Sequence, residues 1–234
     1  MSADEFIKSG AVISIFTTFD ATMDIVYEDN HILIINKPAG ISVEDDGRGG
    51  QTVLSWAEER SGSRYKPLLC HRLDNQTTGL LIIAKTSEAE SVLNDAIKNR
   101  NILKEYTCLV KGTPVPEHAI LKAYLDKDPV RSTVRVLGEP IRNTKPIITE
   151  YHVIEKGDIA RVQINLITGR THQIRAHMAF IGHPVLGDDK YGDRLFNKVN
   201  NVGHLKLCAS KLTFRVDGCL SYLNDRCFSI QAPF

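Results

Sequence analysis

The segment HRLDNQTTGLLIIAK, residues 71–85, places a carboxylate where it could take part in chemistry. Asp74 stands between a His-Arg pair and a polar turn that leads into an apolar run. A carboxylate in this setting can act as a nucleophile or a base. It can also accept hydrogen bonds from the amides of Gln76 or Thr77 in an ordinary turn. The segment alone leaves both interpretations open.

A second polar cluster follows an apolar strand near residue 169. Its members are Arg170, His172, Gln173, Arg175 and His177. Two arginines at the start of a helix are unfavourable beside the positive end of the helix dipole, so they need an anionic partner. The Asp74 carboxylate or a phosphate would serve. An arginine would also hold such a carboxylate ionised and oriented.

Two other side chains could contribute to a site. Tyr106, in KEYTCLVKG, is either a half-buried strand tyrosine or an aromatic face on which a base could stack. Cys70 precedes the first segment and could be a nucleophile, but its neighbours Leu68 and Leu69 indicate a core position. Composition does not choose between these interpretations.

Metal and phosphate motifs are not recognised. His172, His177 and His183 are spaced by five and then six residues, which does not match HExxH, and we expect no metal and no cofactor. The glycines of DDGRGGQT, residues 45–52, do not form a GxxxxGK[ST] loop. The five cysteines form no CxxC pair, so reduced and mostly buried thiols are expected rather than disulfides or a zinc site.

The composition indicates a folded chain with an uneven charge distribution. Charged residues make up 24% and hydrophobic residues 42% of the 234 residues. Residues 1–60 hold 4 basic and 11 acidic side chains, which leaves 25 basic and 17 acidic ones in the remainder. This excess favours an anionic partner such as a nucleic acid. Without a membrane-spanning apolar run or a basic leader, we expect a cytoplasmic protein that does not enter a membrane.

The pattern of apolar residues predicts an α+β fold with a largely antiparallel sheet. Strands are expected within 31–40, 79–85, 105–112, 149–156, 160–168 and 204–216, and helices within 51–60, 86–100 and 170–182. Thr52 is the expected N-cap of the first helix, and Thr86 or Ser87 that of the second. Residues 1–24 are expected to be an arm or an extra strand.

Three segments in this order resemble the RluA family of RNA pseudouridine synthases: HRLDNQTTGLLIIAK, KEYTCLVKG and LITGRTHQIRAHMAFIGHPVLGDDKYG. EDNHILIINKPAGISV resembles the opening strand and turn of that family, and the likeness runs from about Ile25 to Phe214. It implies a pseudouridine synthase fold with helices flanking the sheet, and a catalytic domain over 25–234 without a preceding S4 domain. The implied reaction converts uridine to pseudouridine in structured ribosomal or transfer RNA, without cofactor, by a monomer.

The resemblance also implies roles for single residues. Asp74 matches the catalytic aspartate, which acts at the ribose while the base detaches, rotates and rejoins through C5. Arg72 matches the arginine that fills the space of the flipped base, and Tyr106 the tyrosine that packs on the base and helps proton transfer at C5. Arg175 matches the arginine that pairs with the aspartate. Three further residues are assigned to substrate binding: His71, Arg170 and His172.

The sequence departs from the family pattern at two places. QTTG stands where a Thr-Ser-Gly is more common, and Cys208 stands where many members have histidine. Two alternative functions stay open. One is a non-catalytic RNA-binding module of the same fold, and the other is a hydrolase that uses Asp74 with His71 or His172.

Overall fold

A computed structural model describes residues 23–45, 47, 49–128 and 133–234. Most of the segment expected to be an arm, residues 1–22, lies outside the described residues. The described strands are β1 (Asp24–Glu28), β2 (Ile32–Lys37), β3 (Leu68–Leu69), β4 (Thr78–Ala84), β5 (Ile102–Lys111), β6 (His118–Asp128), β7 (Thr133–Leu137), β8 (Lys145–Glu155), β9 (Ile159–Leu166), β10 (Leu207–Phe214) and β11 (Cys227–Ser229). The helices are α1 (Val53–Ser61), α2 (Ser87–Lys98), α3 (Gln173–Phe180), α4 (Arg194–Val199) and the 3₁₀ helix η1 (Gly218–Leu223).

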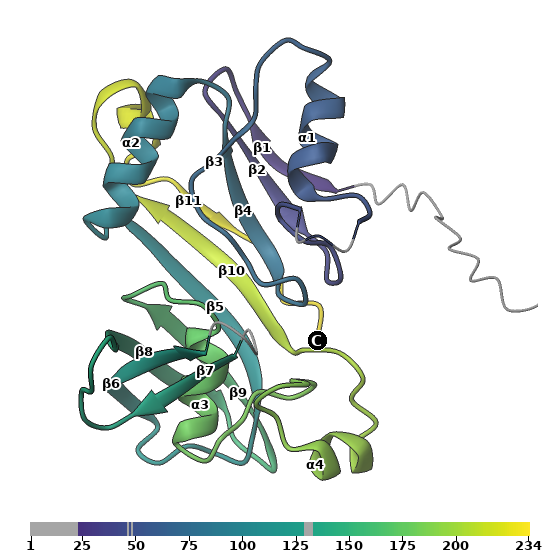
Figure 1. The fold of residues 1–234 in the computed structure, drawn as a ribbon, viewed down its shortest axis with the longest axis vertical. Coiled ribbons are helices and arrows are strands. Elements are labelled where there is room, and N and C mark those ends of the chain that lie inside the picture. Colours follow the sequence, from purple (N-terminus) through teal and green to yellow (C-terminus); the bar gives the residue numbers. More distant parts are fainter. Residues whose placement is uncertain (1–22, 46, 48, 129–132) are drawn as a thin grey trace, which may run out of the picture.

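The strands form one continuous sheet in the order β1-β2-β4-β10-β5-β9-β8-β6-β7, with β11 beside β10 and β3 beside β4. The pairing of β4 with β10 is parallel, and the other described pairings are antiparallel. Figure 1 shows β5 and β10 running from the upper half of the molecule into the lower half. The predicted class, an α+β fold with a mixed, largely antiparallel sheet flanked by helices, is confirmed.

The central strands β2 and β4 are apolar because both faces of the sheet are covered. Leu33, Ile35, Leu81 and Ile83 belong to one core, together with side chains of α1 and α3. The alternate residues Ile32, Ile34, Leu80 and Ile82 belong to a second core with α2 and η1. All eight are fully buried, and each such burial contributes about 1.5–3 kcal/mol. These two cores fix β4, which follows the Asp74 segment, and its neighbour β2.

One glycine is required where β4 meets β10. Gly79 pairs with Ala209, its φ is +113°, and a Cβ there would lie 2.4 Å from the Ala209 carbonyl oxygen. A side chain would therefore be both strained and in collision with backbone. Gly79 sets the close approach of these two strands a few residues after Asp74.

The predicted helix starts are confirmed for α1 and α2. The Thr52 side chain accepts a hydrogen bond from the Ser55 amide, and the Ser55 side chain accepts one from the Thr52 amide, which forms a capping box. Thr86 accepts from the amide of Ala89. The third helix is shorter than the expected 170–182, because His172 adopts a left-handed φ of 51° and α3 begins only at Gln173.

Several elements were not predicted. The strands β6 and β7 received no assignment, although they form an edge of the sheet. The prediction of mostly buried thiols was wrong: all five cysteines are free, but only Cys108 and Cys208 are buried, and Cys227 is exposed. Cys227 lies on β11, where only the middle residue of the strand is buried. None of the described helices is long and apolar enough to cross a membrane.

Candidate active site

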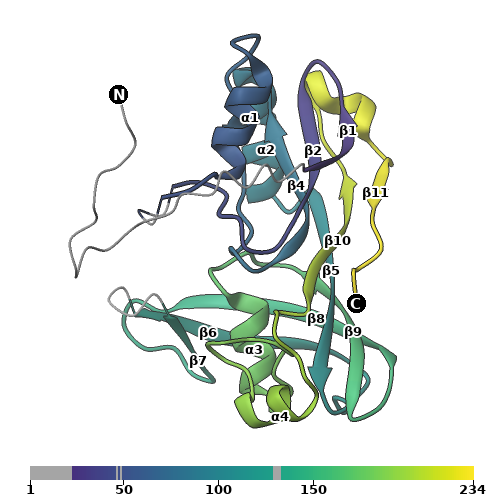
Figure 2. The same cartoon turned by 90° about the vertical axis from the view of Figure 1, so that its right-hand side faces the viewer.

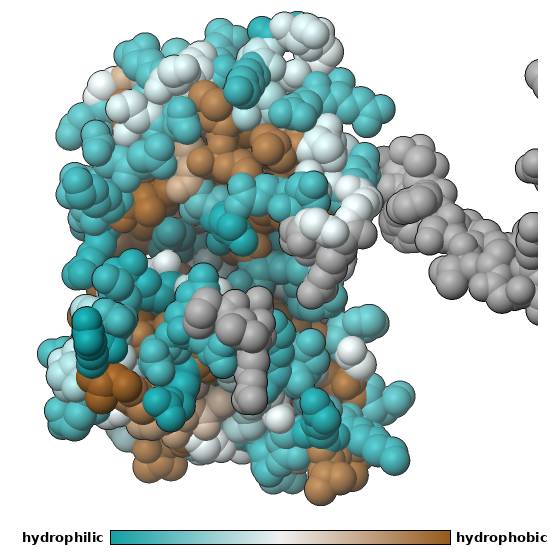
Figure 3. Space-filling model, in the orientation of Figure 1, coloured by the Kyte–Doolittle hydropathy of each residue, from teal (hydrophilic) through white to brown (hydrophobic). Residues whose placement is uncertain are grey.

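The Asp74 segment connects β3 to β4, and this loop reaches the middle of the view between the two halves of the molecule (Figure 1). Figure 3, drawn in the same orientation, shows the surface hollowed there. Figure 2 shows α3 in the lower half, beside the strands of that half. Residues from both halves can therefore meet at one place, although they are about a hundred positions apart in the chain.

The turn at Asp74 does form, but through the backbone. The Asp74 carbonyl accepts a hydrogen bond from the Thr77 amide at 3.0 Å. The carboxylate instead accepts a bond from Arg175 Nη1 at 3.2 Å, and His172 Nε2 lies 3.9 Å from the same oxygen. The Asp74 side chain keeps 26% of its surface exposed. It is held from one side and accessible from the other, as a reacting carboxylate must be.

Arg175 organises the acidic groups of the site. Its Nε and Nη2 donate to the two oxygens of Asp188, both at 2.7 Å, and Nη2 also donates to Asp189 at 3.1 Å. Burial lowers the pKa of Arg175, but the hydrogen bonds and charges of Asp188 and Asp74 outweigh it and raise the pKa above its usual value. The guanidinium stays charged. The predicted Arg175–Asp74 pair is present, and Asp188 makes the shorter bonds.

Asp188 was not predicted. Its side chain has no exposed surface, and it also accepts the amides of Lys190 and Tyr191 at 2.9 and 3.0 Å. Burial raises the pKa of Asp188, but the Arg175 bond and charge outweigh burial and lower it. The acidic pair of GDDKYG, following two arginines that need an anion, was the signal available in the sequence.

His172 joins the Asp74 site to β7. Its Nδ1 lies 2.9 Å from the Tyr191 hydroxyl, and that hydroxyl accepts the Val134 amide at 2.9 Å. Burial lowers the pKa of His172. The charge of Asp74 opposes this shift, and the charge of Arg175 adds to it. The ring is therefore neutral near pH 7 and is a hydrogen-bonding group rather than a cation.

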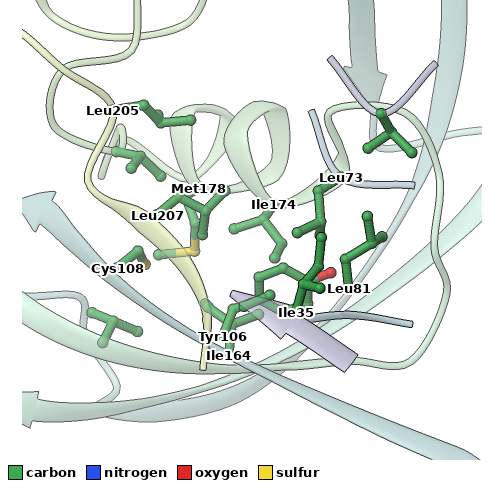
Figure 4. Close-up of a cluster of buried hydrophobic side chains, with 14 of the residues drawn as sticks. Ile35, Leu73, Leu81, Tyr106, Cys108, Ile164, Ile174, Met178, Leu205 and Leu207 are labelled. Atoms are coloured by element: carbon green, nitrogen blue, oxygen red, sulfur yellow. The ribbon is translucent and has the colours of Figure 1, made fainter. Parts of the chain in front are cut away.

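Tyr106 lies on β5 with 6% of its surface exposed. Figure 4 shows it among apolar side chains, including Ile164 and Leu207. Burial, followed by the negative charge of Asp74, raises the pKa of its phenol. Because the hydroxyl remains protonated, Tyr106 offers an aromatic ring and a neutral OH, and the charge of Asp74 acts on that OH.

The remaining predicted site residues fall into two environments. Arg72 keeps 70% of its side chain exposed and pairs with Glu44, and Arg170 is also exposed. His71 points inward: its Nε2 accepts the Ile82 amide at 3.0 Å, and burial lowers its pKa to about 3, with a further contribution from Lys104. Its geometry favours a structural role over contact with a substrate.

Lys37 is a second residue that sequence reasoning missed. It is fully buried, and its Nζ donates to the carbonyls of Pro38, Ile41 and Asn75 at 2.8–2.9 Å. Burial lowers the pKa of Lys37 to about 8, while the charge of Asp74 opposes the shift. Because Asn75 directly follows Asp74, this lysine anchors the backbone that carries the carboxylate.

The histidines considered as metal ligands have separate hydrogen-bond partners. His177 Nδ1 lies 2.9 Å from the Thr149 hydroxyl, and His183 Nδ1 lies 2.9 Å from the Lys111 carbonyl. With His172 facing Tyr191, these three do not form a group of metal ligands within the described residues.

Comparison with known proteins identifies the family. A sequence profile described as RNA pseudouridylate synthase matches residues 31–180, which include Asp74, Tyr106 and Arg175. The chain belongs to this family. The resemblance seen in the sequence motifs is thereby confirmed.

Individual relatives support this assignment. Ribosomal large subunit pseudouridine synthase C of Vibrio cholerae is 40% identical over 179 residues, which are 74% of this chain and 54% of the relative. The protein of the same name from Escherichia coli is 36% identical over 176 residues, 74% of this chain and 54% of the relative. The chain thus spans about half the length of these curated relatives.

A solved structure shows the same fold. Human RNA Pseudouridylate Synthase Domain Containing 1 matches with a TM-score of 0.73 at 23% identity, over 95% of this chain and 86% of that one. At this identity the likeness concerns the fold alone.

Proposed function

We propose that this chain converts uridine to pseudouridine in a structured ribosomal or transfer RNA, with Asp74 as the nucleophile. The observation that carries the proposal is the accessible Asp74 carboxylate held 3.2 Å from Arg175 inside a chain of the pseudouridylate synthase family. The bond between the ribose and N1 breaks, and a bond from the same ribose carbon to C5 forms. A proton leaves C5 and one is gained at N1, so no cofactor is consumed.

The surrounding residues fit the steps of this reaction. A base in a folded RNA must leave its stack before the reaction, at a cost of a few kcal/mol. We assign Arg72, which is exposed and lies two residues before Asp74, to the vacated space. Tyr106 then offers its ring to the flipped base and its neutral hydroxyl to proton transfer at C5. Arg170 and His172 are assigned to RNA contact and to holding the segment.

The two alternatives predict different outcomes. A hydrolase would use Asp74 with His71 or His172, but His71 Nε2 already accepts the Ile82 amide. A second acidic partner is not free either, because both oxygens of Asp188 are engaged by Arg175. A non-catalytic module would keep RNA binding without modification. Cytoplasmic location, the monomeric state and the domain limits 25–234 stay predictions.

The test is pseudouridine mapping of total cellular RNA by carbodiimide labelling and reverse-transcription stops. A strain lacking the protein is compared with strains complemented by wild type, by Asp74→Asn, or by Asp158→Asn as an exposed carboxylate control in the turn between β8 and β9. We expect one or more stops to vanish in the deletion and to return with wild type and Asp158→Asn only.

Binding of the affected RNA by purified protein completes the test. Asp74→Asn removes the reactive oxygen and little contact surface, so its affinity should stay within a few fold of wild type. Full modification by Asp74→Asn would refute the nucleophile. Identical maps in all strains, with RNA binding intact, would favour the binding module, and turnover of a nitrophenyl ester without RNA modification would favour the hydrolase.

A further inference from the structure

A group of possible metal ligands lies on β6 and β8. His118, at the start of β6, pairs directly with His152 of β8 across the two strands, and their rings stack with centroids 4.0 Å apart. Glu150 lies two residues before His152 and therefore on the same face of the sheet. One ligand atom from each of the three lies within 4.8 Å of the others.

The two distances from Glu150 to the histidines are close to those between ligands of a tetrahedral ion. Glu150 Oε1 lies 3.0 Å from His118 Nε2 and 3.6 Å from His152 Nε2. Bonds of about 2.0–2.1 Å to zinc, at tetrahedral angles, separate ligand atoms by about 3.3 Å. The two rings stack at an interplanar angle of 8°, so they must turn out of this stack before all three ligand atoms can face one ion, with water in the fourth position. Two imidazoles and one carboxylate are a ligand set that Zn²⁺ prefers and Mg²⁺ does not.

A neighbouring side chain orients the carboxylate. Asn165 of β9 donates from Nδ2 to Glu150 Oε2 at 2.8 Å, so the other oxygen faces the two histidines. Outer hydrogen bonds of this kind fix a ligand's direction in metal sites.

The cluster is separate from the Asp74 site. Thr149 and Tyr151, the neighbours of Glu150 on β8, are buried, and Thr149 contacts Gln173 and His177 of α3. Since successive strand residues point to opposite faces, Glu150 and His152 point away from α3. His118 is exposed, and Glu150 and His152 are partly exposed, so an ion can reach them from solvent.

We propose that His118, Glu150 and His152 form a binding site for a divalent transition-metal ion, with Zn²⁺ as the best fit. A bound ion links β6 to β8 on the face of the sheet away from Asp74. The site does not depend on the proposed RNA chemistry, and its test can succeed or fail independently of it.

The test is isothermal titration calorimetry on the full chain after it has been stripped with EDTA and dialysed. ZnCl₂ and MgCl₂ are titrated in separate experiments. Wild type is compared with His152→Asn, Glu150→Gln and a control, His204→Asn, which removes an exposed imidazole outside the cluster. We expect one saturable zinc site in wild type and His204→Asn, at least tenfold weaker binding in the two cluster variants, and no magnesium binding.

Co²⁺ in place of zinc distinguishes this site from the cysteines. Nitrogen and oxygen ligands give d–d bands without the thiolate charge-transfer band that a cysteine ligand produces. Circular dichroism confirms that each variant folds. Equal zinc affinity in wild type and both cluster variants, a thiolate band with Co²⁺, or no saturable binding would each overturn the proposal.

Discussion

The buried contact between Arg175 and Asp188 allows a sharp test of what holds the candidate site together. The Asp188 side chain has no exposed surface, and that of Arg175 is 5% exposed. Asp188→Asn keeps the shape but removes the charge and turns one acceptor into a donor that faces the guanidinium. Removing one partner from a buried ion pair costs about 3–5 kcal/mol. Because Asp74 and Asp189 still contact Arg175, we expect Asp188→Asn to lower the free energy of unfolding by about 3 kcal/mol, the low end of this range.

The adjacent residue provides a matched control. Asp189 contacts the same guanidinium through a single bond of 3.1 Å, but its side chain is 73% exposed. An exposed ion pair contributes about 0–1 kcal/mol. Asp189→Asn makes the same chemical change one position later, and it should lower the free energy of unfolding by less than about 1 kcal/mol.

The assay is urea denaturation at pH 7, monitored by circular dichroism. The m-value, the dependence of the unfolding free energy on urea concentration, is fitted separately for each variant. A loss below about 1 kcal/mol in Asp188→Asn, or an equal loss in both variants, would refute the reasoning that burial decides the contribution.

The pH dependence gives a second readout for the same pair. The pKa of Asp188 is lowered from 3.8 in the folded chain. Its contribution is therefore complete above the unfolded value and is lost as the pH falls through the folded pKa. Wild type and Asp188→Asn should differ fully at pH 7 and converge only in acid below about pH 4. A difference that vanishes near pH 6 would assign the effect to another group.

Gly79 and His177 lie on elements that hold the candidate site in position. Gly79→Ala should lower the free energy of unfolding by about 2–5 kcal/mol, because a side chain there is strained and collides with Ala209. The control Gly138→Ala, where a Cβ would have no atom within 4 Å, should change it by less than about 0.5 kcal/mol. Thermal melts check both variants, and a Gly79→Ala protein as stable as wild type would contradict the close strand contact. Burial lowers the pKa of His177 from 6.5 to about 4, so the unfolded chain takes up a proton first and stability falls as the pH drops from 6.5 towards 4. His177→Gln, which can still bond Thr149, should show a shallower fall in denaturation series across this range, and equal slopes would show that His177 does not titrate as described.

Local features were readable from the chain because they depend on neighbours in sequence. The caps at Thr52 and Thr86 need only the residues of the following turn, and the apolar runs of β2 and β4 report burial on both faces. The long motifs around Asp74 and Arg175 identified the family by their residues and their order along the chain. The contact between these two residues was implied by the family resemblance, whereas the pair of arginines required only an anion, which Asp74 or a phosphate could supply.

Contacts between distant segments were decided only by the tertiary structure. Asp188 could not be chosen over Asp74 as the main partner of Arg175, because both satisfy the same charge requirement and only folding buries one of them. His71 sits in a segment that looked wholly functional, yet the fold turns its ring towards a backbone amide of β4. His118 and Glu150 are brought together by the register of β6 on β8, and the register depends on which faces the whole sheet buries, which linear spacing does not record.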